Sequence, residues 1–202
     1  MENIMKHRKI LVFLLLSLFI VPVAHGANDS WELDKAHSNI FFSVDHIFSK
    51  VNGHFNDFST EVVFDPKDLS GSSFAFTIKV ASIDTNMSKR DKHLKSNDFF
   101  DAGKYPAMVF TSTAVTAGDD GLYNVEGTLT VKGQSYNVTL PLVYAGMKDH
   151  PAIRGKEVAG FNGKIVIDRL AFAIGSGKFY KMGVVGKDVE VFVSLEVVRS
   201  KQ

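Results

Sequence analysis

Apolar and polar residues alternate one by one along several long segments of this chain, and this alternation limits the folds open to it more than any other feature. Residues 136–144 place Tyr, Val, Leu, Leu and Tyr at every second position, and residues 189–197 repeat the pattern with Val and Leu. Segments 74–80 and 123–131 alternate in the same way. Successive side chains of a strand point to opposite faces, so the pattern predicts antiparallel strands with one buried and one wet face.

Segments of this kind cover most of the chain after residue 30. They predict eight or nine strands, near residues 31–34, 38–46, 52–64, 73–83, 106–117, 122–132, 135–145, 156–168 and 186–198. Short turns such as 119–121 (DDG) join neighbouring segments, which leaves a sandwich or a closed barrel. Several segments exceed the usual length of about 5–6 residues, which favours the tilted strands of a barrel.

We therefore expect an all-β protein, an extended antiparallel eight-stranded barrel. Eight strands enclose a bore that side chains fill or that just holds one small ligand. From composition alone, a packed core explains the 17 Phe better than a ligand channel does. Strict alternation predicts that Lys79, Glu126 and Asn137 face water. It also predicts inward-facing side chains at Phe74, Phe76, Ile78, Tyr123, Val125, Tyr136, Val138 and Leu140.

The first 26 residues have the features of a secretory signal peptide. Three basic residues, Lys6, Arg8 and Lys9, precede an apolar run over residues 10–23, and residues 24–26 (AHG) offer a small-residue cleavage site. The run has about 14 residues, fewer than the roughly 20 that a membrane-spanning helix needs, although an uncleaved N-terminal anchor is the alternative. We expect residues 27–202 to form one exported domain without a stable membrane anchor.

The charge and composition of the expected mature chain exclude several classes of protein. Residues 27–202 hold 20 Lys and Arg (23 minus Lys6, Arg8 and Lys9) against 21 Asp and Glu (22 minus Glu2). This balance argues against a nucleic acid partner, because neutralising phosphates requires a basic surface. The chain has no cysteine, which excludes a disulfide framework, thiol catalysis and a lipoprotein anchor.

Residues 85–101 form a connection that carries more chemistry than a spacer needs. It contains the units RDKHL at 90–94 and SNDFFD at 96–101, whereas most connections have about 4–6 residues in all. Ser88 and Asp91 have the spacing of a capping box, so we predict a short helix within the 85–105 loop. Basic residues outnumber Asp91 by three in this helix, which favours an anionic or planar group near its N-terminus.

Several segments resemble the motifs of one protein family. Residues 31–38 (WELDKAHS) resemble its W-x-I-D-x-x-H-S opening, and residues 83–110 resemble its I-D-T…R-D-x-H-L-x-S-x-D-F-F-D-x-x-x-Y-P-x-x-x-F signature. Residues 127–133 (GTLTVKG) match its G-x-L-T-[IV]-x-G turn. The chain is thereby similar to the YceI-like family along its mature length. This resemblance implies a lipocalin-like barrel, export to the bacterial periplasm, and binding of a polyisoprenoid or quinone-type lipid within the barrel.

The expected function is therefore that of a soluble periplasmic carrier of a long-chain isoprenoid lipid, without a further cofactor. An interaction module with a filled barrel is one alternative. A hydrolase or isomerase that uses Asp91, His93 or His46 as acid/base groups is another, and we expect no enzyme. The spacing of His37, His46, His54 and His93 matches no usual metal-ligand pattern, so we predict no metal site. The oligomeric state stays open, a dimer included.

The expected ligand contacts fall into two groups. The residues of the loop and of one strand end that would meet the ligand are Arg90, Asp91, His93, Phe99, Phe100 and His46. For Phe99 and Phe100 the alternative is that they plug the barrel end as part of the core. For Arg90 and Asp91 a structural role is favoured slightly over ligand contact, with Arg90 paired to Asp91 or Asp98 to fix the loop. Inward-facing residues of the strands would meet the tail: Phe74, Phe76, Ile78, Tyr123, Tyr136 and Val138.

Overall fold

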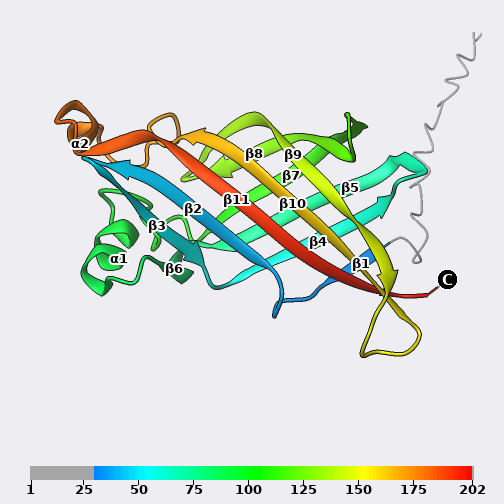
Figure 1. Cartoon of the computed structure of the whole chain (residues 1–202). Coiled ribbons are helices and arrows are strands. Elements are labelled where there is room, and N and C mark those ends of the chain that lie inside the picture. Colours follow the sequence, from blue (N-terminus) through cyan, green and yellow to red (C-terminus); the bar gives the residue numbers. More distant parts are fainter. Residues whose placement is uncertain (1–29, 202) are drawn as a thin grey trace, which may run out of the picture.

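The computed structural model describes residues 30–201, and the expected signal peptide over residues 1–26 lies outside the described residues. No helix in the described part is long and apolar enough to cross a membrane. The elements follow one another along the chain (Figure 1) as β1 Ser30–Leu33, β2 Asn39–His46, β3 Ser49–Phe55, β4 Phe58–Asp65, β5 Asp68–Lys79, a 3₁₀ turn Val80–Ser82, β6 Ile83–Asp84, α1 Ser88–Lys95, β7 Ala107–Ala117, β8 Leu122–Val131, β9 Gln134–Asp149, β10 Lys156–Asp168, α2 Lys178–Lys181 and β11 Val185–Ser200.

Eight antiparallel strands close into a barrel. Hydrogen-bonded neighbours run β1-β4-β5-β7-β8-β9-β10-β11, and β1 pairs again with β11, where Glu32 lies opposite Val198. The remaining strands extend this wall, because β2 pairs with the first half of β11, β3 with β2, and β6 with β3. The predicted barrel is confirmed, and so is a short helix, α1, within the 85–105 loop.

The predicted count of eight or nine strands was too low. Residues 52–64 belong to two strands, because Asn56 and Asp57 separate β3 from β4. The backbone N–H of Asn56 donates to Ser82 O at 3.2 Å, and that of Lys79 donates to Asp57 O at 2.9 Å. These bonds join the break between β3 and β4 to the break between β5 and β6. The β3–β4 stretch and the β5–β6 stretch of the chain therefore bend at the same place.

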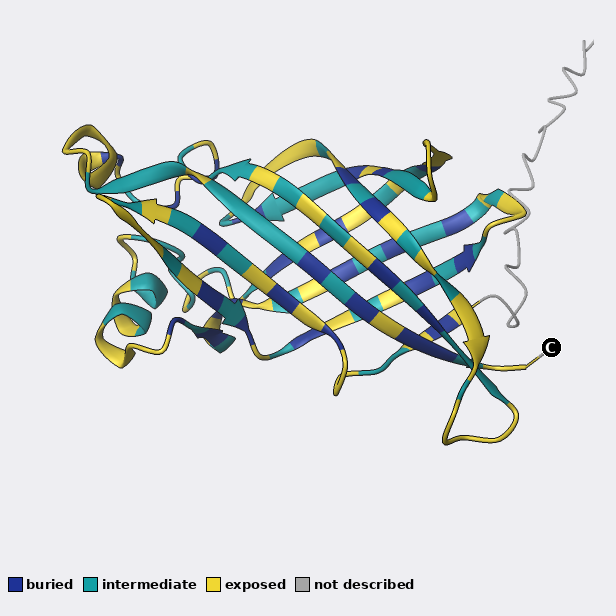
Figure 2. Ribbon diagram, in the orientation of Figure 1, coloured by how far each residue is buried: buried dark blue, intermediate teal, exposed yellow. Residues whose placement is uncertain are grey.

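The facing of the side chains follows the predicted alternation. Figure 2 shows buried and exposed bands that change along the strands. Phe74, Phe76, Val125 and Leu140 are buried, and Ile78, Tyr123 and Val138 are half-buried and pack against the core. Lys79, Glu126 and Asn137 are exposed as predicted. Tyr136 is the exception: it is 44% exposed near the start of β9, and its hydroxyl donates to Ala171 O at 3.2 Å.

Aromatic side chains fill the half of the barrel that lies away from the two helices. The Phe64 ring contacts those of Phe74, Tyr123, Tyr144 and Phe161 at centroid distances of 5.9, 5.1, 5.2 and 5.0 Å. Edge-on and tilted pairs of this kind stabilise by roughly 0.5–1.5 kcal/mol each beyond the area that they bury. This half of the bore is therefore a packed core.

Candidate ligand cavity

The half of the barrel beside α1 and α2 is hollow. Its cavity has a volume of about 190 Å³ and is lined by side chains of β2, β3, β5 to β11, α1, the loop after α1 and the segment between β10 and α2. A single water needs only about 10–15 Å³ on the same measure, so side chains do not fill this half of the bore. Of the described residues that line the cavity, only Arg169 has an ionisable side chain. The lining therefore suits an apolar ligand.

The loop after α1 forms part of the cavity wall. Leu94, Phe99 and Phe100 line the cavity, and the Phe100 ring meets the Phe55 ring edge-on at 6.3 Å. His93 stands behind Phe99, with ring centroids 4.9 Å apart and its Nε2 3.4 Å from Asp98 Oδ2. The structure thus places the two predicted phenylalanines at the cavity, whereas His93 supports one of them from outside.

Arg90 and Asp91 both bind Thr85, which is 3% exposed. The Arg90 guanidinium donates from Nε to Thr85 Oγ1 at 2.7 Å and from Nη2 to Thr85 O at 2.6 Å. Asp91 Oδ1 accepts from Thr85 N at 2.9 Å and from Thr85 Oγ1 at 2.5 Å. Neither residue lines the cavity, so this geometry favours the structural role for Arg90, with Thr85 rather than a carboxylate as its partner.

The predicted capping box was wrong. Met87 is the N-cap of α1, and no side chain caps this end of the helix. Asp91 is drawn instead to two donors of Thr85, which a carboxylate can satisfy together. The spacing of Ser88 and Asp91 fits the motif, but the tertiary contact with Thr85 competes successfully for the carboxylate.

The predicted tail contacts divide between the two halves of the barrel. Phe76, Ile78 and Val138 line the cavity. Phe74 and Tyr123 face inward but belong to the aromatic core that fills the other half. Tyr136 and His46 are not part of the lining either. Tyr136 packs edge-on against Phe172 at 4.9 Å, and His46 ends β2 at the hairpin to β3.

Arg169 is a residue of the cavity that the sequence reasoning missed. It is 6% exposed, and its guanidinium donates to the carbonyl oxygens of Gly186, Ile174 and Val185 at 2.7, 2.8 and 3.3 Å. Burial lowers the pKa of Arg169 from its usual value, yet an arginine stays charged in a protein. The sequence signal that could have identified Arg169 is its position, because it is a basic residue directly after the predicted strand over residues 156–168.

Two contacts hold together the segments around Phe99, at the end of the cavity beside the helices, and we call this end the cavity mouth. Lys132 Nζ donates to the carbonyl oxygens of Phe99 and Ala173, the latter at 3.0 Å, and so joins the loop after α1 to the segment before α2. Gly175 has a φ of +80°, and a Cβ at this position would lie 2.9 Å from Arg169 Nη1 and 3.2 Å from the Phe99 ring. The close approach of these three residues therefore requires glycine.

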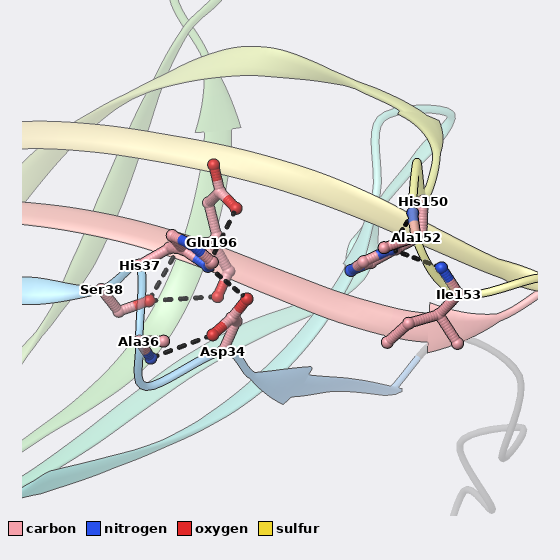
Figure 3. A network of polar contacts seen from close by, with 8 residues as sticks. All are labelled: Asp34, Ala36, His37, Ser38, His150, Ala152, Ile153 and Glu196. Carbon is pink, nitrogen blue, oxygen red and sulfur yellow. Dashed lines mark hydrogen bonds and ion pairs between the residues drawn. The ribbon is translucent and has the colours of Figure 1, made fainter.

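A separate polar cluster lies at the loop between β1 and β2 (Figure 3). His37 Nδ1 lies 2.7 Å from Asp34 Oδ2 and 3.9 Å from Glu196 Oε2, and Ser38 Oγ donates to Glu196 O. The hydrogen bond with Asp34 raises the pKa of His37, and it lowers the pKa of Asp34. These contacts tie the loop to β11 as an ion-pair network, apart from the cavity.

Comparison with known proteins agrees with this geometry. A family model described as the YceI-like domain matches residues 31–197. A UPF0312 protein of Pectobacterium atrosepticum is 36% identical over 195 residues, which cover 93% of this chain and 97% of that protein.

Solved structures share the fold. The crystal structure of BcnA from Burkholderia cenocepacia has a TM-score of 0.72 and 30% sequence identity, over 84% of this chain and all of that one. A polyisoprenoid binding domain from Saccharophagus degradans, implicated in plant cell wall breakdown, has a TM-score of 0.61 over 85% of this chain and 98% of its own. At 14% identity, the likeness to the second structure concerns the fold alone.

Proposed function

This chain belongs to the YceI-like family, and from that premise we propose that it carries a long-chain isoprenoid-type lipid, a polyprenyl lipid or a quinone, through the periplasm. The observation that carries the proposal is the apolar cavity between the aromatic core and the helices. Burial of a CH₂ group contributes about 0.8 kcal/mol, so one five-carbon isoprene unit contributes on the order of 4 kcal/mol. Two or three buried units then suffice for roughly micromolar affinity before the ordering costs are subtracted.

A longer tail needs more room than the cavity offers. Ligand pockets usually have volumes of about 300–1,000 Å³, and this cavity has about 190 Å³. Phe99 and Phe100 belong to an irregular segment between α1 and β7, so their outward movement widens the cavity without breaking the barrel wall. We infer that ligand entry moves these two side chains.

The polar head of the ligand would bind near Arg169. A guanidinium has five N–H donors, and three hydrogen bonds of Arg169 go to backbone carbonyl oxygens. The remaining N–H donors are suited to bind an oxygen of a phosphate or a quinone, rather than an apolar part of the ligand. Arg90, by contrast, uses its guanidinium on Thr85.

The alternatives have less support from the cavity. An interaction module would have a filled barrel, and only the aromatic half of the bore is filled. A hydrolase or isomerase needs an acid/base group beside the ligand, and Asp91, His93 and His46 do not line the cavity. The proposal of a periplasmic location depends on the signal-like residues 1–26 and on the family resemblance.

Native mass spectrometry of protein purified without detergent tests the proposal. We expect an added mass that extraction and fragmentation identify as an isoprenoid lipid. Val138→Trp fills the cavity and should reduce binding of long tails before short ones, whereas Val143→Trp, on the exposed face of the same strand, should bind as the parent does. Protein that stays empty and takes up neither added polyprenyl phosphate nor added quinone would refute the proposal.

A further inference from the structure

Exposed apolar side chains gather at the end of the molecule that carries α2 and the β2–β3 hairpin, beside the cavity mouth (Figure 1). Phe48, at the tip of the β2–β3 hairpin, is fully exposed (102%), and its neighbour Ile47 is 57% exposed. Phe179, Tyr180 and Met182, in and directly after α2, are 38%, 44% and 62% exposed. We call these five residues the rim surface. Side chains of this size are usually buried, and a group of them on one surface marks an interaction site.

Backbone and ring contacts make the rim surface continuous with the cavity mouth. The N–H of Ile47 donates to Val184 O at 3.1 Å, and the N–H of Val184 donates to Phe179 O at 2.9 Å, so the hairpin tip lies beside α2 (Figure 1). The Phe179 ring stacks on the Phe99 ring at 6.5 Å, and Phe99 lines the cavity. A ligand that leaves past Phe99 therefore emerges at the rim surface.

Both helices at this end of the molecule carry lysines (Figure 1). Lys178 and Lys181 lie on α2, and Lys89, Lys92 and Lys95 lie on α1. None of these five lysines forms an ion pair with a described carboxylate, whereas Lys50, Lys79 and Lys164 do. Nearby carboxylates are engaged, because Asp45 pairs with Lys50, Asp98 with His93, and Asp91 with Thr85. The end of the molecule thus offers unpaired positive charge beside exposed rings.

The hairpin tip keeps this arrangement at a conformational cost. Ile47 has a φ of +51°, in the left-handed region that a β-branched residue rarely adopts. Glycine or asparagine would fill this turn position without strain. A strained backbone that presents two large apolar side chains to solvent points to a role for those side chains outside the fold.

We propose that the rim surface docks on a membrane that contains anionic phospholipids, with Phe48 and Met182 inserted between the head groups and the lysines against the phosphates. Aromatic and aliphatic side chains flanked by lysines are the combination that binds at the membrane interface. Docking in this orientation places the cavity mouth on the bilayer, so a lipid passes between membrane and barrel without crossing water. The lipid transfer rests on the proposed function, whereas the docking does not.

Vesicle flotation tests the docking. The purified protein is mixed with phosphatidylcholine vesicles that contain or lack phosphatidylglycerol, at low and high salt. We expect binding to the anionic vesicles, weakened by salt. Phe48→Ser with Met182→Ser should lower the bound fraction by about tenfold or more. Lys178→Glu with Lys181→Glu should remove the preference for phosphatidylglycerol.

The matched control is Val143→Ser with Val166→Ser, because these residues are 45% and 55% exposed on the side wall of the barrel. The control should float as the parent does, and circular dichroism verifies the fold of every variant. The proposal is overturned if the parent protein floats with neither vesicle type. It is also overturned if the rim variant and the control variant lose the same share of the bound fraction.

Uptake of a quinone added from ethanol, without vesicles, separates this proposal from the proposed function. The Phe48/Met182 variant should load as the parent does, since its cavity is unchanged. A protein that docks but never loads leaves the docking in place and refutes the carrier. A protein that loads but does not dock refutes the docking and leaves the carrier in place.

Discussion

At the scale of single residues, side chains that look alike in the sequence have different tasks. Arg90 and Arg169 each donate to backbone carbonyl oxygens, but only Arg169 lines the cavity. Arg90 fixes Thr85 at the point where β6 ends and the loop begins. Position relative to the bore, rather than charge, separates the group that a ligand meets from the group that shapes the loop.

Arg90→Ala should weaken the binding of charged lipids and of neutral lipids by the same factor, about fivefold. This factor corresponds to roughly 1 kcal/mol, the contribution of the hydrogen bonds that order the loop. The equal effect follows because the guanidinium binds Thr85 and not the ligand. Titration of one polyprenyl phosphate and one quinone measures it. Lys92→Ala, an exposed change on the same helix, is the control. A loss restricted to the phosphate would restore Arg90 to the head-group site.

His37 should make stability depend on pH. Its pKa is raised in the folded protein, so its contribution is present below the unfolded value near 6.5 and is lost as the pH rises through the folded value. The contribution of Asp34, whose pKa is lowered, is lost in acid instead. The difference in Tm between the parent and His37→Gln should therefore be larger at about pH 5.5 than at about pH 9. A difference that grows toward alkaline pH would contradict this assignment.

At the scale of the elements, breaks in the strands shape the barrel as much as the strands do. β3 and β4 bend at Asn56 and Asp57, and β5 bends beside them into β6. The space left between β6 and β7 is spanned by α1 and the loop that carries Phe99 and Phe100. This connection, which carries Phe99 and Phe100, is therefore a part of the cavity wall that is not strand.

The β2–β3 hairpin should gain stability when its strain is removed. Ile47→Asn places a residue that tolerates the left-handed conformation at a φ of +51°. We expect an increase of about 1 kcal/mol in the free energy of unfolding, since a left-handed L-residue costs roughly 1–2 kcal/mol. Urea denaturation of Ile47→Asn and of Ile47→Val, which keeps the strain, measures the difference. Equal stability of the two variants would show that the turn is not strained.

At the scale of the whole molecule, the two halves of the barrel have opposite properties. Phe64 is surrounded by rings, whereas Phe76 borders the cavity. Phe64→Ala should cost about 3–5 kcal/mol of stability, and Phe76→Ala should cost less because contacts are lost on one side only. Phe76→Ala should also admit a longer tail, which native mass spectrometry of the bound lipid detects. A larger stability loss for Phe76→Ala would contradict the division into halves.

Alternation along the strands predicted the barrel and the inward side of Phe74, Phe76 and Val138, because side-chain facing is a local property of a strand. It did not predict which inward residues pack together and which leave a space. That outcome depends on rings from β4, β5, β8, β9 and β10 that meet only in the folded barrel. The head-group role of Arg90 failed to appear in the geometry for a similar reason, since Thr85 becomes its partner only when the loop folds.

Closure of the barrel through β1 and β11 has a consequence for how the protein folds. Glu32 and Val198 are 166 positions apart in the chain (198 minus 32), so the last pairing has the greatest entropic cost of loop closure and depends on the final strand. Trp31, the only tryptophan in the chain, lies at this seam: its Nε1 donates to Phe64 O, and the Arg199 guanidinium covers its ring at 4.3 Å. Tryptophan fluorescence in a stopped-flow experiment should therefore report the final, rate-limiting step of folding, after the rest of the sheet has formed.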